Sequence, residues 1–218
     1  MPNKAVIAGA SGLIGSSLLN ILLDAQQYDE VLVLVRKELP IQNKKLVQLI
    51  IDFDKLDDHK AAITGHALFC CLGSTQKKTP DLAEYRKVDH DYPLQLAQLA
   101  KQNGVRQYHL VSALGANAKS SNFYLKMKGE TEEDIQKVGV KRLDIYQPSF
   151  LTGHRTEHRP KERFVGSLFK FIDLLLIGGL KKYSSISAET VSRAMFKQSL
   201  KTEEGIFVHP SDKIKLLA

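Results

Sequence analysis

Three polar residues have the types and spacing of a proton-transfer site. Tyr124 and Lys128 are four residues apart in a segment of helical period, so their side chains share one face of a helix. No other tyrosine in the chain has a lysine four residues on, and the strand before this pair ends at Ser112. Together, a serine hydroxyl, a tyrosine phenol and a lysine ammonium could polarise a carbonyl, deliver a proton and lower the pKa of the phenol. The alternative is an amphipathic helix with an exposed lysine.

A glycine-rich turn near the start of the chain is the second candidate site. In "AVIAGASGLIGSSLLNILL", Gly9, Gly12 and Gly15 interrupt an apolar run, which then continues with helical period. Glycines between a first strand and a helix permit a tight turn, close approach of a diphosphate and close helix packing. The amides at the start of the helix then face an anion. The alternative is a plain turn before a helix, but the alternating β and α pattern favours a dinucleotide site.

The end of the second apolar run bears on the choice of cofactor. Arg36 and Lys37 follow "VLVLV", where an acidic residue would bind a ribose 2'-hydroxyl and an arginine would accommodate a 2'-phosphate. Guanidinium matches phosphate geometry, so we predict NADP(H) rather than NAD. The alternative is that both are ordinary strand-end charges and that Glu38 reaches the ribose.

These residues need a framework of strands joined by crossover helices. Short Val/Ile/Leu-rich runs alternate with longer segments of helical period, which is typical of a doubly wound parallel α/β sheet. The predicted strands are "KAVIA", "VLVLV", "LVQLII", "ALFCC", "QYHLV" and "RLDIY", and the predicted helices span 12–25, 81–104 and 122–139, with a short piece at 57–63. We expect one Rossmann-type domain over 1–218, in which about 148–218 cover one end of the sheet and shape the substrate pocket. This last third reads as helices, "FVGSLFKFIDLLLIGG" and "AETVSRAMFKQSL", and a late strand at "GIFVH".

Composition restricts the partners and the location. The net charge of +7 could indicate nucleic acid, an anionic membrane or a phosphorylated ligand, but the lysines are scattered among acids. We therefore expect a solvated basic surface, a small-molecule substrate and no nucleic-acid partner, and we allow for a homodimer. Cys70 and Cys71 are adjacent, so we expect core residues rather than a disulfide framework or a metal site. With no uncharged run long enough to span a bilayer and no signal peptide, we predict a cytoplasmic protein.

Several motifs in combination resemble the short-chain dehydrogenase/reductases, in particular the small atypical or extended-like branch that includes the Tat-interacting-protein oxidoreductases. The resemblance covers nearly the whole chain and rests on "GASGLIG", "VLVLVRK", "IDFD", "FCCLGST", "VDHDYPLQLAQLAKQNGVRQYHLVSALGA", "SSNFYLKMKGETE" and "YQPSFLTGHRTEHRP". It implies hydride transfer between NADPH and a carbonyl or alcohol. Tyr124 would be the general acid/base, Lys128 would hold the nicotinamide ribose and tune Tyr124, and Ser112 would orient the substrate oxygen.

The resemblance also implies a set of cofactor contacts. The diphosphate would lie on the glycine turn, the 2'-phosphate near Arg36, the adenine beside the "IDFD" segment and its ribose along "CLG", with the nicotinamide near "PS". The residues implied are Gly9, Ser11, Gly12, Leu13, Ile14, Arg36, Lys37, Asp52, Phe53, Cys71, Leu72, Gly73, Tyr124, Lys128, Pro148 and Ser149.

Two positions depart from the family pattern. Many relatives have Asn in the helix before the fifth strand, where this chain offers Asp89 or Asp91, which cannot donate an amide hydrogen bond when ionised. The usual Arg before Pro148 is Gln147. Three other functions therefore stay open beside the oxidoreductase: a non-catalytic NADP(H) sensor or scaffold, an isomerase or epimerase that uses bound cofactor, and, least favoured, nucleic-acid binding.

Two segments after Pro148 have competing interpretations. His154 and His158 are four apart, but Arg155 and Arg159 would repel a cation, so we predict no metal site. The same basic stretch, through Arg163, could bind an anion or be a solvated loop. The apolar segment 164–183 could lie on a membrane surface or at a subunit interface, although packing over the sheet is the more common arrangement.

Overall fold

A seven-stranded parallel sheet forms the centre of the molecule. The computed structural model describes residues 3–75, 79–152 and 184–218. All neighbouring strands of the sheet are parallel, in the order β3-β2-β1-β4-β5-β6-β9. The strands are β1 (Lys4–Ala8), β2 (Glu30–Val35), β3 (Leu46–Ile50), β4 (Ala67–Cys70), β5 (Gln107–Val111), β6 (Arg142–Gln147) and β9 (Gly205–Pro210), and a separate pair is formed by β7 (Leu151–Thr152) and β8 (Ile186–Ser187).

The central strands are apolar along their whole length because both faces of the sheet are covered. Ile7 of β1 pairs with Val33 of β2 and with Phe69 of β4, and all three are fully buried. Such continuous burial is expected for a parallel sheet between two helical layers, where alternation with polar residues is not needed. The doubly wound parallel sheet predicted from the sequence is confirmed.

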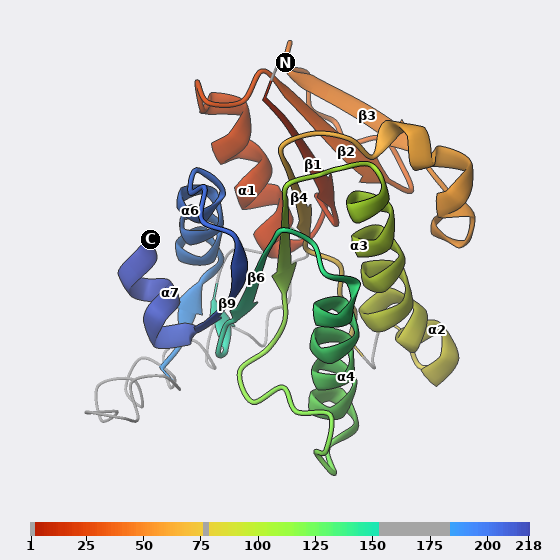
Figure 1. Ribbon diagram of the computed structural model, residues 1–218, viewed down its shortest axis with the longest axis vertical. Helices are drawn as coiled ribbons and strands as arrows, with labels where there is room; N and C mark the ends of the chain where they lie inside the picture. The colour runs from red at the N-terminus through yellow and green to blue at the C-terminus, as the bar shows by residue number, and fades with distance from the viewer. Residues whose placement is uncertain (1–2, 76–78, 153–183) are drawn as a thin grey trace.

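Helices cover the two faces of the sheet in separate groups (Figure 1). On one face lie α1 (Leu13–Asp24) and α6 (Ala188–Ser199), which pack together through a hydrogen bond from the Ser192 hydroxyl to the Ile14 carbonyl, and α7 (Ser211–Leu217) packs against α6. On the other face lie α3 (Tyr92–Gln102) and α4 (Phe123–Val138). Each group buries its own apolar cluster against the sheet.

The segment predicted as one helix over 81–104 is divided in the structure. It consists of α2 (Leu82–Arg86), a π-helical turn η2 (Lys87–Asp91) and then α3. A separate 3-10 helix, η1 (Phe53–Ala62), stands where a short piece at 57–63 was expected. A π turn holds an extra residue, and such turns occur frequently at functional sites.

The last part of the chain extends the sheet as well as covering it. The strand expected at "GIFVH" is β9, which pairs with β6 from Arg142 opposite Gly205 to Gln147 opposite Pro210. The predicted late strand is therefore confirmed, and it joins the main sheet, so this region extends the sheet as well as lying over it. The predictions for His154, His158 and the basic stretch through Arg163, and for the apolar segment 164–183, concern residues outside the described ranges.

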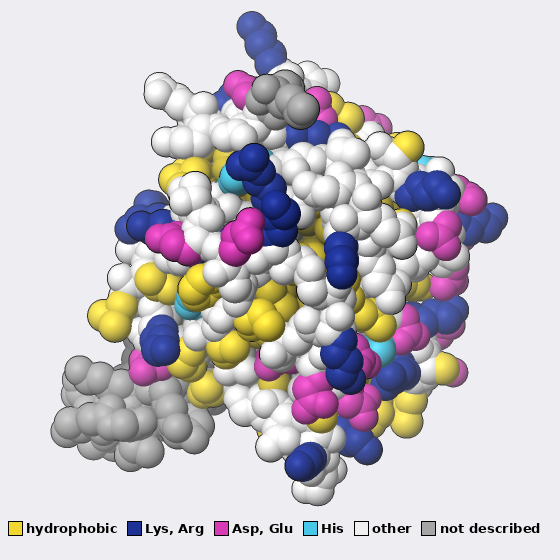
Figure 2. Space-filling view, viewed as in Figure 1, with side chains coloured by type: hydrophobic (Ala, Val, Ile, Leu, Met, Phe, Trp, Pro, Cys, Tyr) yellow, Lys and Arg dark blue, Asp and Glu magenta, His cyan; other side chains and the backbone are white. Residues whose placement is uncertain are grey.

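The surface and the helices give two further observations. On the face shown in Figure 2, Lys and Arg side chains are interspersed with acidic ones rather than gathered in one patch. Within residues 3–75, 79–152 and 184–218, none of the helices combines the length and apolar character needed to cross a bilayer.

Candidate functional site

A cleft of about 480 Å³ lies at the carboxyl ends of β1, β4 and β5. The strand order reverses between β1 and β4, because the chain runs outward to β3 on one side and to β5 and β6 on the other. Ligands of open α/β sheets bind at this kind of switch point. The lining residues are Ser11, Gly12, Leu13, Ile14, Ser16, Cys71, Leu72, Gly73, Ser74, Thr75, Asp89, Val111, Ser112, Tyr124, Lys128 and Leu151.

The glycine turn forms one wall of this cleft and has no room for side chains. Gly9 has a φ of +88°, and a Cβ atom on it would lie 2.6 Å from the backbone carbonyl of Cys71. A Cβ on Gly15 would lie 2.1 Å from the Gly9 carbonyl oxygen. Both contacts are with backbone atoms, which cannot move aside as a flexible side chain could.

The start of α1 fits an anion such as a diphosphate. Gly12 is the N-cap of this helix, and no side chain caps its first amides. Uncapped N–H groups at a helix N-terminus, with the positive end of the helix dipole, bind phosphate groups. The glycine turn and this helix end together could hold the diphosphate of a dinucleotide cofactor.

The three predicted proton-transfer residues lie in the same cleft. Tyr124 is in the first turn of α4 and is 39% exposed, whereas Lys128, one turn later, is buried. Ser112 directly follows β5, where its amide donates to the Tyr146 carbonyl at 2.7 Å. The Ser112 Oγ atom is buried and makes no well-formed hydrogen bond to any residue the structure describes.

Asp89 also lies in the cleft and forms an ion pair with Lys128. Its Oδ1 atom is 2.8 Å from the Lys128 Nζ atom, and its Oδ2 atom accepts a hydrogen bond from the Ser74 amide at 2.7 Å. The Thr131 hydroxyl donates to the Asp89 carbonyl at 3.0 Å. Asp89 comes from the π turn and Lys128 from α4, so the ion pair joins two elements across the bottom of the cleft.

Burial and these charges shift the proton affinities of the site. Burial raises the pKa of Tyr124, Lys128 opposes this rise, and the Asp89 carboxylate adds to it. Burial is the largest single influence on Lys128 and disfavours its charged form, but Asp89 together with Tyr124 and Cys70 raises the pKa of Lys128 above its ordinary value. Tyr124 is therefore protonated and Lys128 is charged at neutral pH.

A second buried carboxyl lies behind Ser112. The Gln147 Nε2 atom is 3.0 Å from each carboxylate oxygen of Glu132, and it donates to this carboxylate. Burial raises the pKa of Glu132, and the nearby Ser112 hydroxyl and the Gln147 amide only partly offset the rise. Gln147, noted in the sequence as a replacement for the usual Arg, therefore gives this carboxyl a neutral partner.

Other predicted cofactor contacts lie at the same edge of the sheet but do not line the cleft. Arg36 and Lys37 are exposed directly after β2, the strand next to β1. Asp52 caps η1 by accepting a hydrogen bond from the Asp54 amide, and Phe53 is buried against other apolar residues. Gly9 lies behind the lining residues, within the turn.

Pro148 and Ser149 make structural contacts in the described parts of the chain. The Pro148 carbonyl accepts a hydrogen bond from the Leu114 amide at 2.9 Å. The Ser149 hydroxyl donates to the Ser184 carbonyl at 2.5 Å and lies 2.8 Å from the Ser211 hydroxyl. Neither residue lines the cleft, and the nicotinamide contacts implied for them remain predictions.

Six lining residues were not among the predicted site residues: Ser16, Ser74, Thr75, Asp89, Val111 and Leu151. Ser74 and Thr75 directly follow Gly73 in "CLGST", so continuing the motif by two residues would have found them. Leu151 reaches the cleft through β7, a two-residue strand with no sequence signal of its own.

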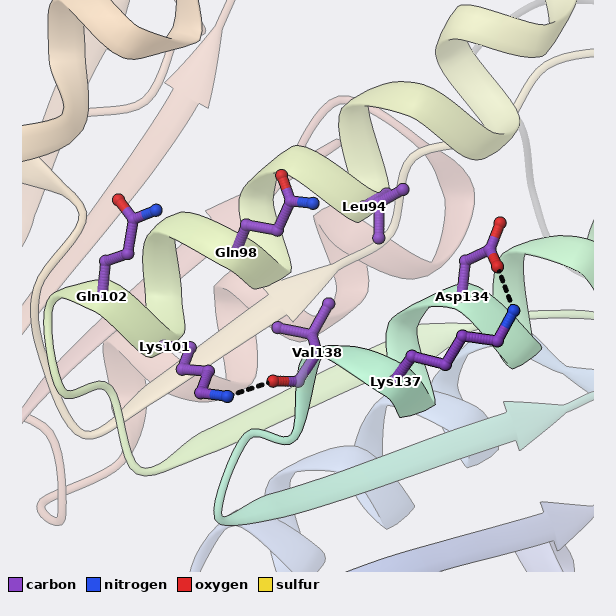
Figure 3. A pocket seen from close by; sticks show the side chains of 7 residues that line it. All are labelled: Leu94, Gln98, Lys101, Gln102, Asp134, Lys137 and Val138. Atoms are coloured by element: carbon purple, nitrogen blue, oxygen red, sulfur yellow. Dashed lines mark hydrogen bonds and ion pairs between the residues drawn. The ribbon is translucent and has the colours of Figure 1, made fainter.

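A second hollow, of about 390 Å³, lies between α3 and α4 on the outer surface (Figure 3). Two of the lysines that line this hollow bond to groups of α4. Lys137 donates to Asp134 at 2.8 Å, and Lys101 donates to the Val138 carbonyl at the end of α4. This hollow is separate from the cleft at the strand ends.

Comparison with known proteins places the chain in a family. The family described as NAD(P)H-binding matches residues 9–159. Protein HTATIP2 of Rattus norvegicus is 38% identical over 177 residues, which cover 77% of this chain and 73% of that protein. The chain belongs to the atypical short-chain dehydrogenase/reductases. This confirms the resemblance drawn from the sequence motifs, and NAD(P) binding is the property that the family match supports.

Fungal members of this family overturn the predicted location. The mitochondrial protein fmp52 of Aspergillus clavatus is 30% identical over 224 residues, covering all of this chain and 95% of that protein. Mitochondrial FMP52 of Saccharomyces cerevisiae is 35% identical over 169 residues, 76% of this chain and 72% of that protein. The prediction of a cytoplasmic protein is therefore wrong, because it rested on the lack of a recognisable signal, whereas similar family members are named as mitochondrial.

Several solved structures share the fold of this chain. MoeE5 in complex with UDP-glucuronic acid and NAD has a TM-score of 0.72 at 16% identity, covering 95% of this chain and 75% of that one. The UDP-N-acetylglucosamine 4-epimerase of Methanobrevibacter ruminantium has a TM-score of 0.71 at 15% identity, covering 96% and 77%. At this identity the likeness concerns the fold alone.

Proposed function

We propose that this short-chain dehydrogenase/reductase is an NADP(H)-dependent oxidoreductase that acts on a small carbonyl or alcohol. The observation that carries the proposal is the meeting of Ser112, Tyr124 and Lys128 with the glycine turn in one cleft. These side chains come from the end of β5 and from α4, so it is the fold, and not only their spacing in the sequence, that brings them to the same cleft as the glycine turn.

In the reduction of a carbonyl, each of these residues has a separate role. Ser112 orients the carbonyl oxygen, and the Tyr124 O–H bond breaks as its proton passes to that oxygen. When bound, NADPH would supply the hydride that the carbonyl carbon accepts and would thereby be oxidised to NADP+. The Tyr124 phenolate that remains takes up a proton from solvent, and Lys128 would hold the nicotinamide ribose. The glycine turn and the uncapped start of α1 hold the diphosphate.

Arg36 supports the choice of NADP(H). It is exposed directly after β2, at the sheet edge that carries the glycine turn, and a guanidinium pairs with phosphate through two hydrogen bonds. Hydrogen bonds to charged groups contribute about 1.5–3 kcal/mol. Loss of this contact should weaken NADPH binding about tenfold or more.

Calorimetric titration with NADPH and NADH tests the cofactor. Arg36→Ala should lose NADPH affinity and leave NADH affinity little changed, and Lys37→Ala, the neighbouring cation, is the matched control. If wild-type protein binds neither nucleotide, the proposal fails. If Arg36→Ala binds NADPH as wild type does, the choice of cofactor fails.

Oxidation of NADPH in the presence of a panel of aldehydes and ketones tests the reaction. Tyr124→Phe should reduce turnover at least about a hundredfold, because it removes the proton donor, while NADPH binding survives. The second candidate is a non-catalytic NADP(H)-binding protein, favoured by Asp89 at the position where many relatives have Asn. That candidate predicts tight NADPH binding without oxidation by any member of the panel.

A further inference from the structure

The Asp89–Lys128 ion pair is buried at the bottom of the cleft. The two residues are 1% and 5% exposed, and their charged atoms are 2.8 Å apart. A buried charge is stable only when it is paired, so each member requires the other. Asp89 Oδ1 has no other polar partner in the ranges that the structure describes.

The fold holds Asp89 in place from three directions. The π turn presents its side chain to the cleft, the Ser74 amide donates to Oδ2, and the Thr131 hydroxyl donates to its backbone carbonyl. These contacts come from the β4 end and from α4, the two elements beside the pair. The carboxylate therefore has a fixed position relative to the Lys128 ammonium.

The cleft gives a ligand access to the pair. Residue 73 is a glycine, and a Cβ atom there would lie 3.5 Å from Asp89 Oδ1 and 3.8 Å from Lys128 Nζ. The bare backbone of Gly73 therefore leaves open the space directly beside both charges. An ammonium has three N–H donors, so Lys128 can hold Asp89 and still donate to a ligand.

We propose that Asp89 is a positioning residue that holds Lys128 in a neutral ion pair, so that Tyr124 keeps its proton and serves as the proton donor in carbonyl reduction. This inference rests on the proposed function and adds to it the protonation state in which Tyr124 meets the substrate. A lone ammonium beside a phenol promotes its ionisation, and an adjacent carboxylate cancels much of that field.

The other groups that face the pair do not replace Asp89. Cys70 of β4 and Tyr85 of α2 are buried, burial raises both pKa values, and both groups are neutral at physiological pH. Glu132, one turn beyond Lys128 on α4, accepts a hydrogen bond from Gln147, and Lys128 acts on this carboxyl at longer range. Asp89 is the carboxyl in direct contact with the ammonium.

Titration of Tyr124 by NMR with tyrosine labelled at the ring carbon bearing the hydroxyl tests the inference without a substrate. Tyr124→Phe identifies the signal. In wild type the Tyr124 pKa should be at or above its ordinary value of 10.0. In Asp89→Asn it should fall by about one pH unit or more, because the negative charge is removed and the ammonium remains.

The matched control is Asp91→Asn, which removes the same charge from the same π turn. Asp91 bonds His90 and does not line the cleft, so the Tyr124 titration should not move. An unchanged or raised pKa in Asp89→Asn would overturn the inference, as would an equal fall in both variants. The signals of buried Tyr108 and Tyr146 report whether each variant is folded.

A measurement on the wild-type protein keeps the test decisive if Asp89→Asn does not fold. If the Tyr124 phenol of wild type titrates near neutral pH, with or without NADPH, Lys128 is not neutralised and the inference is wrong. Calorimetric titration of the same samples with NADPH distinguishes the two failures. If NADPH binds but Tyr124 titrates near neutral pH, only this inference fails, whereas loss of NADPH binding would overturn the proposed function.

Discussion

Arg142 and Asp144 form a bidentate ion pair inside the protein, with 2.6 Å between Arg142 Nε and Asp144 Oδ2 and 3.1 Å between Arg142 Nη2 and Asp144 Oδ1. Both residues lie on β6 and are almost fully buried. His209 of β9 also bonds Asp144, at 2.8 Å. The pair therefore ties the last strand of the sheet to its neighbour through side chains as well as through the backbone.

Asp144→Ala should destabilise the protein by about 3–5 kcal/mol, because it leaves the Arg142 charge buried without its main partner. Urea denaturation at pH 7 measures the loss. The matched control is Glu189→Ala, which breaks an exposed pair with Arg193 and should cost less than about 1 kcal/mol. Equal losses in the two variants would contradict the importance of the buried pair.

His109 should make the fold sensitive to acid. Burial lowers the pKa of His109 from 6.5 to about 4, so the folded state holds the neutral ring. The stability it contributes is present above pH 6.5 and is lost as the pH falls toward 4, by about 1.4 kcal/mol per unit. Between pH 7 and pH 4.5, the free energy of unfolding should therefore fall by about 2–3 kcal/mol less in His109→Gln than in wild type. Urea denaturation at both pH values gives the two slopes, and parallel slopes would refute this assignment.

Glu132 should have the opposite pH dependence. Because burial raises its pKa in the folded state, its favourable contribution is present at low pH and is lost as the pH rises through that value. Glu132→Gln keeps the shape of the side chain and removes its charge. Between pH 4 and pH 8, the free energy of unfolding of this variant should therefore rise by about 1 kcal/mol relative to that of wild type. Thermal and urea unfolding at both pH values measure the gain. The exposed neighbour Glu133 is the control, since Glu133→Gln should change stability little at either pH.

The glycine turn should tolerate no added methyl group at its centre. Gly15→Ala places a Cβ against the Gly9 carbonyl, so helix α1 must move away from the turn. We expect a loss of about 1–3 kcal/mol in stability and a loss of NADPH binding. Asn20→Ala, an exposed site on the same helix, should leave both unchanged. Normal NADPH affinity in Gly15→Ala would show that the turn does not hold the diphosphate.

Local sequence patterns predict most of the framework. The apolar runs at Lys4–Ala8 and Gln107–Val111 are strands with the predicted bounds, because a strand buried on both faces has a continuous apolar signal. The glycine turn and the Tyr124–Lys128 spacing are also local, and the structure brings both to one cleft.

Pairings between distant segments could not be predicted in this way. Gln147 meets Glu132 across two elements, and the partner of Asp89 depends on the packing of the π turn against α4. The apolar period of 81–104 fits a continuous helix, and the extra residue at 87–91 leaves that pattern nearly intact. The position of β9 beside β6 likewise follows from tertiary packing and not from the strand signal itself.

Which side chain stands at the Asp89 position depends on the number of residues in the π turn as well as on the residue types there. Each residue of an α-helix advances the chain by about 100° around the axis. Deleting one residue from a regular α-helix would turn everything before it by about that angle, but the π turn Lys87–Asp91 holds one residue more than an α turn, so a deletion there would restore α-helical winding with the flanking segments in place and change only which side chain stands at the turn. Evolution by insertion or deletion at this turn could therefore switch which side chain meets Lys128 without a substitution in the cleft.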